Sequence, residues 1–204
     1  MVLIPSDILG CPVYPTIYIT LGLKSMRTAL LVIDVQQALC SGEYKAFESE
    51  RVIERINSVA RKMRTAGCPV VMIQHESQGG PLDFGTEGWK LADGLETQPT
   101  DVFVRKKATD SFHQTALHEL LQERGVKNLV ICGMQSEFCV DTTTRRALAL
   151  QYPVVLVADG HSTLDNNVLS AAQISAHHNE TLANITSFGP RVKAIPASEV
   201  YVEA

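Results

Sequence analysis

Long apolar runs that alternate with amphipathic segments constrain the fold of this chain more than any other feature. The apolar runs cover residues 29–34, 69–75, 101–106, 128–133 and 153–159, and a weaker run lies near Val192–Ile195. Runs of this kind are typical of strands buried on both faces. Between them, residues 49–67, 111–125, 136–151 and 166–185 carry apolar side chains at helical spacing. The pattern predicts an α/β protein with a parallel, doubly wound sheet covered by helices on both sides.

The chain has 204 residues, which suits one domain, and we expect that domain to span residues 26–204. Residues 1–25 are apolar but are interrupted by Pro5, Pro12 and Pro15. They lack a basic n-region and a cleavage site, so they resemble neither a signal peptide nor a membrane span. We expect an N-terminal extension there, which results from an upstream start or packs on the domain as an arm.

Composition narrows the possible partners. The net charge is −4 and basic residues form no long run, which argues against nucleic acid. The five cysteines are odd in number and show no Cys-x-x-Cys spacing. This usage predicts neither a disulfide framework nor a zinc site and favours a reducing cytoplasm. We therefore expect a cytoplasmic protein that binds a small molecule, with neither nucleic acid nor a membrane as partner.

Polar residues follow the ends of the predicted strands. Asp34, His75, Lys106 and Asp159 each close a strand, and a short turn at 133–136 precedes Cys139. Ligands of parallel sheets bind at the carboxyl ends of the strands, where the strand order reverses. In a sheet of order 3-2-1-4-5-6, Asp34, Lys106 and Cys139 would meet at one opening.

These three residue types can act together as a nucleophilic site. A thiol attacks as thiolate, and its free pKa is about 8.5. Ser136 is a predicted N-cap that places Cys139 in the first helical turn, where the helix dipole and Lys106 would favour the anion. Asp34 could then serve as general base and acid. Simpler interpretations also stand: a core cysteine, an aspartate that forms a turn, and a solvated basic run at 105–107.

Three stretches resemble the isochorismatase-like cysteine hydrolases, which include nicotinamidases and N-carbamoylsarcosine amidohydrolase. They are "ALLVIDVQ", "VRKKATDSFHQTAL" and "CGMQSEFCVDTTTRRALALQYPVVLVAD", and the resemblance covers roughly residues 27–190. It implies a three-layer α/β/α sandwich with a six-stranded, mainly parallel sheet in the Rossmann-like order 3-2-1-4-5-6. It also implies a catalytic triad of Asp34 as acid/base, Lys106 as electrostatic partner and Cys139 as nucleophile.

The resemblance refines the site further. Lys106 is preferred over Lys107 because the family places a Phe six residues after its lysine, as Phe112 does here. A cis peptide at Met134–Gln135 is implied, with the backbone amides of Gln135 and Cys139 as the oxyanion hole. Candidate substrate-pocket residues are Gln37, Leu39, His75, Trp89 and Phe138.

The chain departs from the family in its metal motif, at Ser136, where Thr is common, and at Gln151. Nicotinamidases carry an Asp-x-His metal motif after the second strand, whereas this chain reads "IQHES". We therefore expect no metal and no cofactor, and nicotinamidase activity is disfavoured. Gln151 stands where the family usually has a glycine to end a helix, so a non-glycine residue in the left-handed conformation is expected there.

The leading interpretation is an amidohydrolase-like enzyme that cleaves a small amide, ureido or related C–N bond through a Cys139 acyl-enzyme. One alternative is a vinyl-ether hydrolase of the isochorismatase type that relies on Asp34 and not on Cys139. Another is a non-catalytic protein on the same fold that binds small molecules or carries a redox thiol. The resemblance implies a homo-oligomer, a dimer or tetramer, and the Gly-rich and Pro-rich loop at 76–100 is expected to contribute to substrate choice.

Overall fold

The computed structural model describes residues 23–24 and 28–203. The predicted N-terminal extension over 1–25 lies outside this range except for its last part. There, β1 (Leu23–Lys24) pairs in parallel with β8 (Val202–Glu203) near the other end of the chain. The assignment of 1–25 to an extension remains a prediction.

A six-stranded parallel sheet forms the centre of the molecule. Its strands are β2 (Thr28–Ile33), β3 (Val70–His75), β4 (Val102–Lys106), β5 (Asn128–Met134), β6 (Val154–Ser162) and β7 (Val192–Ile195). They lie in the order β4-β3-β2-β5-β6-β7, and every neighbouring pair is parallel. Numbered among themselves, these strands give 3-2-1-4-5-6, so the predicted fold class is confirmed.

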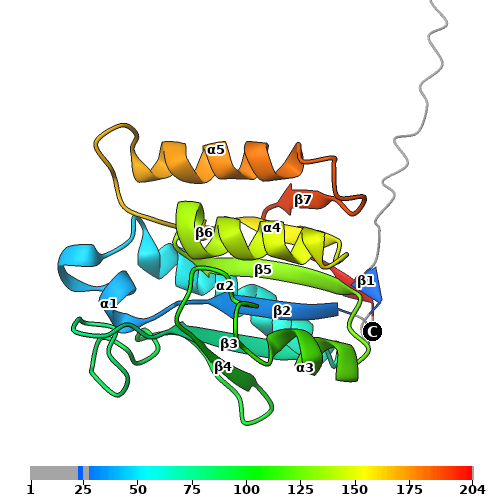
Figure 1. Cartoon of the computed structure of the whole chain (residues 1–204), viewed down its shortest axis with the longest axis horizontal. Helices are drawn as coiled ribbons and strands as arrows, with labels where there is room; N and C mark the ends of the chain where they lie inside the picture. The colour runs from blue at the N-terminus through cyan, green and yellow to red at the C-terminus, as the bar shows by residue number, and fades with distance from the viewer. Residues whose placement is uncertain (1–22, 25–27, 204) are drawn as a thin grey trace, which may run out of the picture.

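Helices cover both faces of this sheet (Figure 1). Helix α2 (Ser49–Thr65) packs on one face, where it meets Leu30 and Val32 of β2. Helices α3 (Leu117–Glu123), α4 (Asp141–Ala149) and α5 (Ala171–Ala183) lie on the other face, which receives the alternate residues of β2. Because successive strand side chains point to opposite faces, a strand covered on both sides is mainly apolar along its whole length.

Two helices begin later than predicted. Helix α3 begins at Leu117 and not near residue 111, because Gln114 has a left-handed φ of 53° that a continuous helix cannot contain. Helix α5 begins at Ala171 and not at 166. Its N-cap is Ser170, whose side chain accepts from the Gln173 amide while the Gln173 side chain binds the Ser170 backbone. A left-handed residue therefore delays the start of α3, and a capping box sets the start of α5.

The carboxyl ends of the strands carry the irregular parts of the chain. Two short helical turns that were not predicted, α1 (Gln37–Cys40) and η2 (Gly42–Tyr44), follow β2. The loop at 76–100 contains turns and isolated bridges but no helix or strand, as expected. In Figure 1, α1 and this loop lie together at the left, where β2 ends. Within the described part of the chain, none of the helices has the length and apolar character needed to cross a membrane.

Candidate active site

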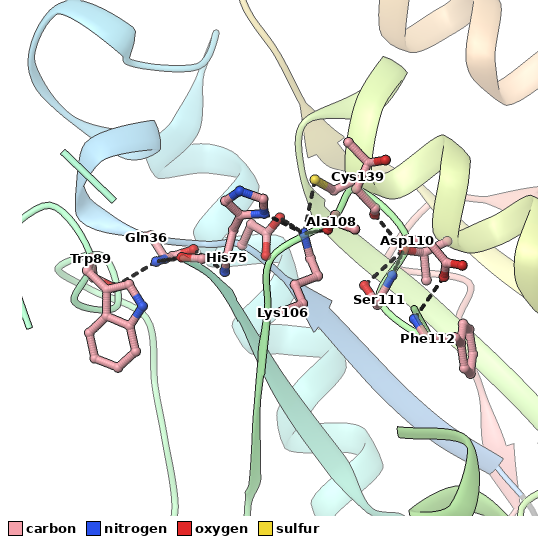
Figure 2. A network of polar contacts seen from close by, with 12 residues as sticks. Gln36, His75, Trp89, Lys106, Ala108, Asp110, Ser111, Phe112 and Cys139 are labelled. Carbon is pink, nitrogen blue, oxygen red and sulfur yellow. Dashed lines mark hydrogen bonds and ion pairs between the residues drawn. The ribbon is translucent and has the colours of Figure 1, made fainter. Parts of the chain in front are cut away.

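Three neighbouring strands bring three polar side chains to one edge of the sheet. Ile33 of β2 pairs with Ile73 of β3, and His75 at the end of β3 pairs with Lys106 at the end of β4. Asp34 follows β2 directly. This register brings Asp34 and His75 into contact with Lys106. Figure 2 shows the Lys106 side chain between His75 and the turn that carries Cys139.

The Lys106 ammonium joins the predicted catalytic groups. Its Nζ lies 2.7 Å from Asp34 Oδ2 and 3.1 Å from Cys139 Sγ. All three residues are buried, and the side chain of Lys106 is fully enclosed. The adjacent Lys107 is 72% exposed and pairs with Glu76. The structure therefore brings Lys106, and not Lys107, to Asp34 and Cys139, and a buried lysine with a buried carboxylate excludes the solvated-edge interpretation.

A glycine allows the turn before Cys139 to approach β2. Gly133 has a φ of +124°, and a Cβ built there would lie 2.0 Å from the Ile33 carbonyl oxygen. One residue further on, the Met134–Gln135 peptide bond is cis, as the resemblance implied. Asp34 itself is left-handed, with a φ of 50°. The backbone on both sides of the site is thus held in conformations that ordinary strands do not adopt.

The predicted role of Ser136 is wrong. Cys139 lies in a π-helical turn, η3 (Ser136–Val140), and the N-cap of that turn is Gln135, whose side chain makes no capping bond. The Ser136 hydroxyl instead contacts His161 Nδ1 at 2.8 Å and Ser175 Oγ at 2.9 Å. The buried imidazole of His161 requires a partner, and Ser136 supplies it instead of capping the helix.

The resting state of the Cys139 thiol also differs from the sequence prediction. Burial first, and then the negative charge of Asp34, raise the pKa of Cys139 to about 12, although Lys106 acts in the opposite direction. Desolvation disfavours the thiolate, and Asp34 cancels much of the benefit of Lys106 because it pairs with the same ammonium. The thiol is therefore protonated at neutral pH, and nucleophilic attack requires a base.

Sequence reasoning missed Gln36. Its side chain is fully buried and accepts from the His75 amide at 2.8 Å. Its Nε2 donates to the His75 carbonyl at 3.0 Å and to the Trp89 carbonyl at 2.8 Å. Gln36 thus fixes the end of β3 and the long loop at once. The glutamine that ends "ALLVIDVQ", shortly after the apolar strand, was the feature in the sequence that could have indicated it.

The predicted pocket residues have different surroundings. His75 contacts the Lys106 ammonium, whereas the Gln37 amide exchanges hydrogen bonds with Asp93 of the long loop. Leu39 packs against the core on the α2 side. The Trp89 ring packs edge-on against Phe84. In Figure 2, Gln36 lies between Trp89 and Lys106. Phe138 is half exposed on the turn next to Cys139.

Three potential metal ligands surround Lys106. Donor atoms of Asp34, His75 and Cys139 lie within 4.8 Å of one another. The Lys106 ammonium is 2.7, 3.2 and 3.1 Å from atoms of the same three side chains. The lysine therefore already supplies a cation to this ligand set. The expected absence of a metal remains a prediction.

Comparison with known proteins identifies the family of this chain. A family model described as "Isochorismatase domain" matches residues 28–187, and the chain belongs to the isochorismatase family of hydrolases. A streptothricin hydrolase from Streptomyces noursei is 38% identical over 82% of this chain, which spans 64% of that relative's length. A ureidoacrylate amidohydrolase from Stutzerimonas stutzeri is 27% identical over 68% of this chain and 71% of its own length. A crystal structure of an isochorismatase family protein has a TM-score of 0.77 and 38% identity, and covers 85% of this chain and 99% of its own.

Proposed function

We propose that the protein hydrolyses a small-molecule amide, ureido or related C–N bond through a Cys139 acyl-enzyme. The observation that carries this proposal is the Lys106 ammonium between the Asp34 carboxylate and the Cys139 thiol, at 2.7 and 3.1 Å. The names of the streptothricin hydrolase and the ureidoacrylate amidohydrolase support a hydrolase of this bond type.

Asp34 is the acid/base of the proposed reaction. Its Oδ1 is buried and accepts no hydrogen bond from the described residues, so it can receive a proton. The Cys139 thiol gives its proton to Asp34 as sulfur attacks the substrate carbonyl carbon. When the C–N bond breaks, Asp34 passes that proton to the leaving nitrogen. Lys106 balances the charge of Asp34 before and after the transfer.

The backbone amides of Gln135 and Cys139 hold the oxyanion in this proposal. Gln135 is the N-cap of the π-helical turn Ser136–Val140, and Cys139 lies within that turn. A correctly placed donor stabilises the tetrahedral intermediate by about 3 kcal/mol. This contribution compensates for a nucleophile that is protonated at rest.

A panel of primary amides and ureido compounds tests the proposal. Ammonia release is measured for the wild type and for Cys139→Ala and Cys139→Ser. We expect both variants to lose release from every accepted substrate, and intact mass spectrometry to detect an acyl adduct on wild-type Cys139. Full activity in Cys139→Ala would refute the acyl-enzyme, and cleavage of a vinyl ether by that variant would favour a reaction that relies on Asp34.

A further inference from the structure

The turn that carries Cys139 is connected to the rest of the molecule by a buried chain of polar side chains. Ser136, the first residue of η3, is completely buried, and its hydroxyl lies 2.8 Å from His161 Nδ1 and 2.9 Å from Ser175 Oγ. On the other side of the imidazole, His161 Nε2 lies 2.9 Å from Asn179 Oδ1. The chain thus joins η3 to strand β6, which carries His161, and to helix α5, which carries Ser175 and Asn179.

The direction of each hydrogen bond in this chain follows from its far end. Asn179 Nδ2 donates to the Ala158 carbonyl oxygen at 2.9 Å, so Asn179 Oδ1 is the atom that faces the imidazole. A carboxamide oxygen only accepts, which places the hydrogen of His161 on Nε2. Burial lowers the pKa of His161, so the ring is neutral at neutral pH and Nδ1 keeps its lone pair. The Ser136 hydroxyl therefore donates to Nδ1 and, because its one hydrogen is used, accepts from Ser175.

The backbone of His161 lies beside the strand that leads into this turn. His161 of β6 pairs with Gly133 of β5, and the next residues along, Ser162 and Met134, also pair. Met134 is the last residue of β5, and only Gln135 separates it from η3. The imidazole therefore reaches the turn from a strand that is already in register with the residues before the turn.

The contact at Ser136 is made where a capping bond would otherwise hold the start of the turn. Gln135 is the N-cap residue, but its side chain makes no capping bond. Ser136 is three residues before Cys139, whose sulfur lies 3.1 Å from Lys106 Nζ. A shift of Ser136 would therefore displace the sulfur and the backbone amides around it. A displacement of about 1 Å at a reacting group can lower a rate by about 100-fold.

We propose that His161 is a positioning residue for the nucleophile, because through the Ser136 hydroxyl it fixes the turn that presents Cys139 and the two oxyanion amides to the substrate. This inference rests on the acyl-enzyme proposed above and deepens it. His161 acts through Ser136 and not on the substrate, so it contributes to the rate of acylation and not to substrate binding. The imidazole accepts one hydrogen bond in this role and neither gains nor loses a proton.

Two substitutions of His161 each keep one half of the imidazole. In His161→Asn the carboxamide oxygen takes the place of Nδ1 and can still accept from Ser136. In His161→Gln the amide nitrogen takes the place of Nε2 and can still donate to Asn179, but the acceptor for Ser136 is lost. A role in stability alone would not distinguish the two variants by the contact with Ser136, whereas the proposed role does.

Acetylation by p-nitrophenyl acetate measures the effect. Single-turnover release of p-nitrophenolate over a range of ester concentrations gives the maximum rate and the half-saturating concentration separately, and Cys139→Ala gives the background. We expect His161→Gln and Ser136→Ala to lower the maximum rate by about 100-fold, with the half-saturating concentration within about twofold of wild type. His161→Asn should stay within about threefold of wild type in both quantities.

Ser162→Ala is the matched control for Ser136→Ala. Ser162 is also a buried serine, but its hydroxyl donates to the Phe47 carbonyl oxygen and not to the turn. This control should lower the melting temperature and keep the wild-type rate of acetylation. If neither variant of His161 folds, the comparison of the two serine variants decides the question, and equal rates in them would overturn the proposal.

The remaining outcomes separate this inference from the proposed function. Equal acetylation rates in folded His161→Asn and His161→Gln, or a wild-type rate in folded Ser136→Ala, would overturn the positioning role while the acyl-enzyme stands. Intact mass spectrometry detects the +acetyl adduct on wild-type Cys139. A wild type that forms no adduct would refute the acyl-enzyme, and the role of His161 with it.

Discussion

The charge on Asp34 governs the thiol at the scale of single residues. Because Asp34 raises the pKa of Cys139, removal of its charge in Asp34→Asn should lower that pKa while Lys106 continues to favour the thiolate. We expect the pH profile of iodoacetamide alkylation at Cys139 to shift to lower pH, while hydrolysis is lost with the acid/base. Peptide mass spectrometry resolves Cys139 from the other thiols. An unchanged or upward shift would contradict this electrostatic account.

At the same scale, the close approach of Gly133 to the Ile33 backbone leads to a prediction about stability. In Gly133→Ala the new methyl group would collide with the Ile33 carbonyl, and the left-handed φ adds strain. We expect a loss of more than about 3 kcal/mol in the free energy of unfolding, measured with urea. Gly125→Ala is the matched control, because its φ of +66° is also left-handed but its Cβ would meet no atom within 4 Å. That control should cost only about 1 kcal/mol.

At the scale of elements, the end of α4 carries a strained residue. Gln151 has a φ of 68°, as its position in the sequence predicted. Gln151→Gly should raise the free energy of unfolding by up to about 1 kcal/mol. The gain is reduced by loss of the Gln151 side-chain bond to the Phe188 carbonyl. Gln151→Ala loses that bond and keeps the strain, so urea titration should find it less stable than wild type.

Strands were easier to predict than helix starts for a physical reason. Burial on both faces gives an apolar run that needs no knowledge of neighbours, as in β2 and β3. Helix starts depended on single bonds, such as the one at Ser170, and on the turn at Gln114. Ser136 was misassigned because its partner, His161, lies on a strand 25 positions further along the chain.

The end of strand β6 was also predicted incorrectly because it depends on residues far away in the sequence. It continues past the predicted end at Asp159 to Ser162, although its last residues are polar. Asp159 pairs with Arg55 and accepts from the Ala197 amide, while Ser162 donates to the Phe47 carbonyl. Polar residues can occupy a buried strand when distant partners satisfy them, and sequence periodicity carries no information about those partners.

At the scale of the whole molecule, the position of the site residues followed from topology, but their protonation did not. Strand order alone placed Asp34, Lys106 and Cys139 at one edge of the sheet. The direction of the Cys139 pKa shift depended on burial by several elements, which a linear sequence does not give. For the same reason Gln36 was missed, because its importance lies in the two segments that it joins.

Gln36 connects β2, the end of β3 and the long loop, which are far apart in the sequence. In Gln36→Leu the His75 amide and the Trp89 carbonyl each lose a buried partner, and each unsatisfied group costs about 1–3 kcal/mol. We expect the free energy of unfolding to fall by about 2–4 kcal/mol and hydrogen exchange to increase in residues 76–100. Hydrolysis should also weaken, because His75 is no longer fixed beside Lys106.

The neighbouring Gln37 provides a matched control for this prediction. It is the same residue type and binds the same loop through Asp93, but it is partly exposed, so water can replace its lost bonds. Gln37→Leu should therefore change the free energy of unfolding by less than about 1 kcal/mol and leave hydrogen exchange at Trp89 near the wild-type rate. Equal effects of the two substitutions would show that the loop, and not the buried amide of Gln36, sets the geometry of His75.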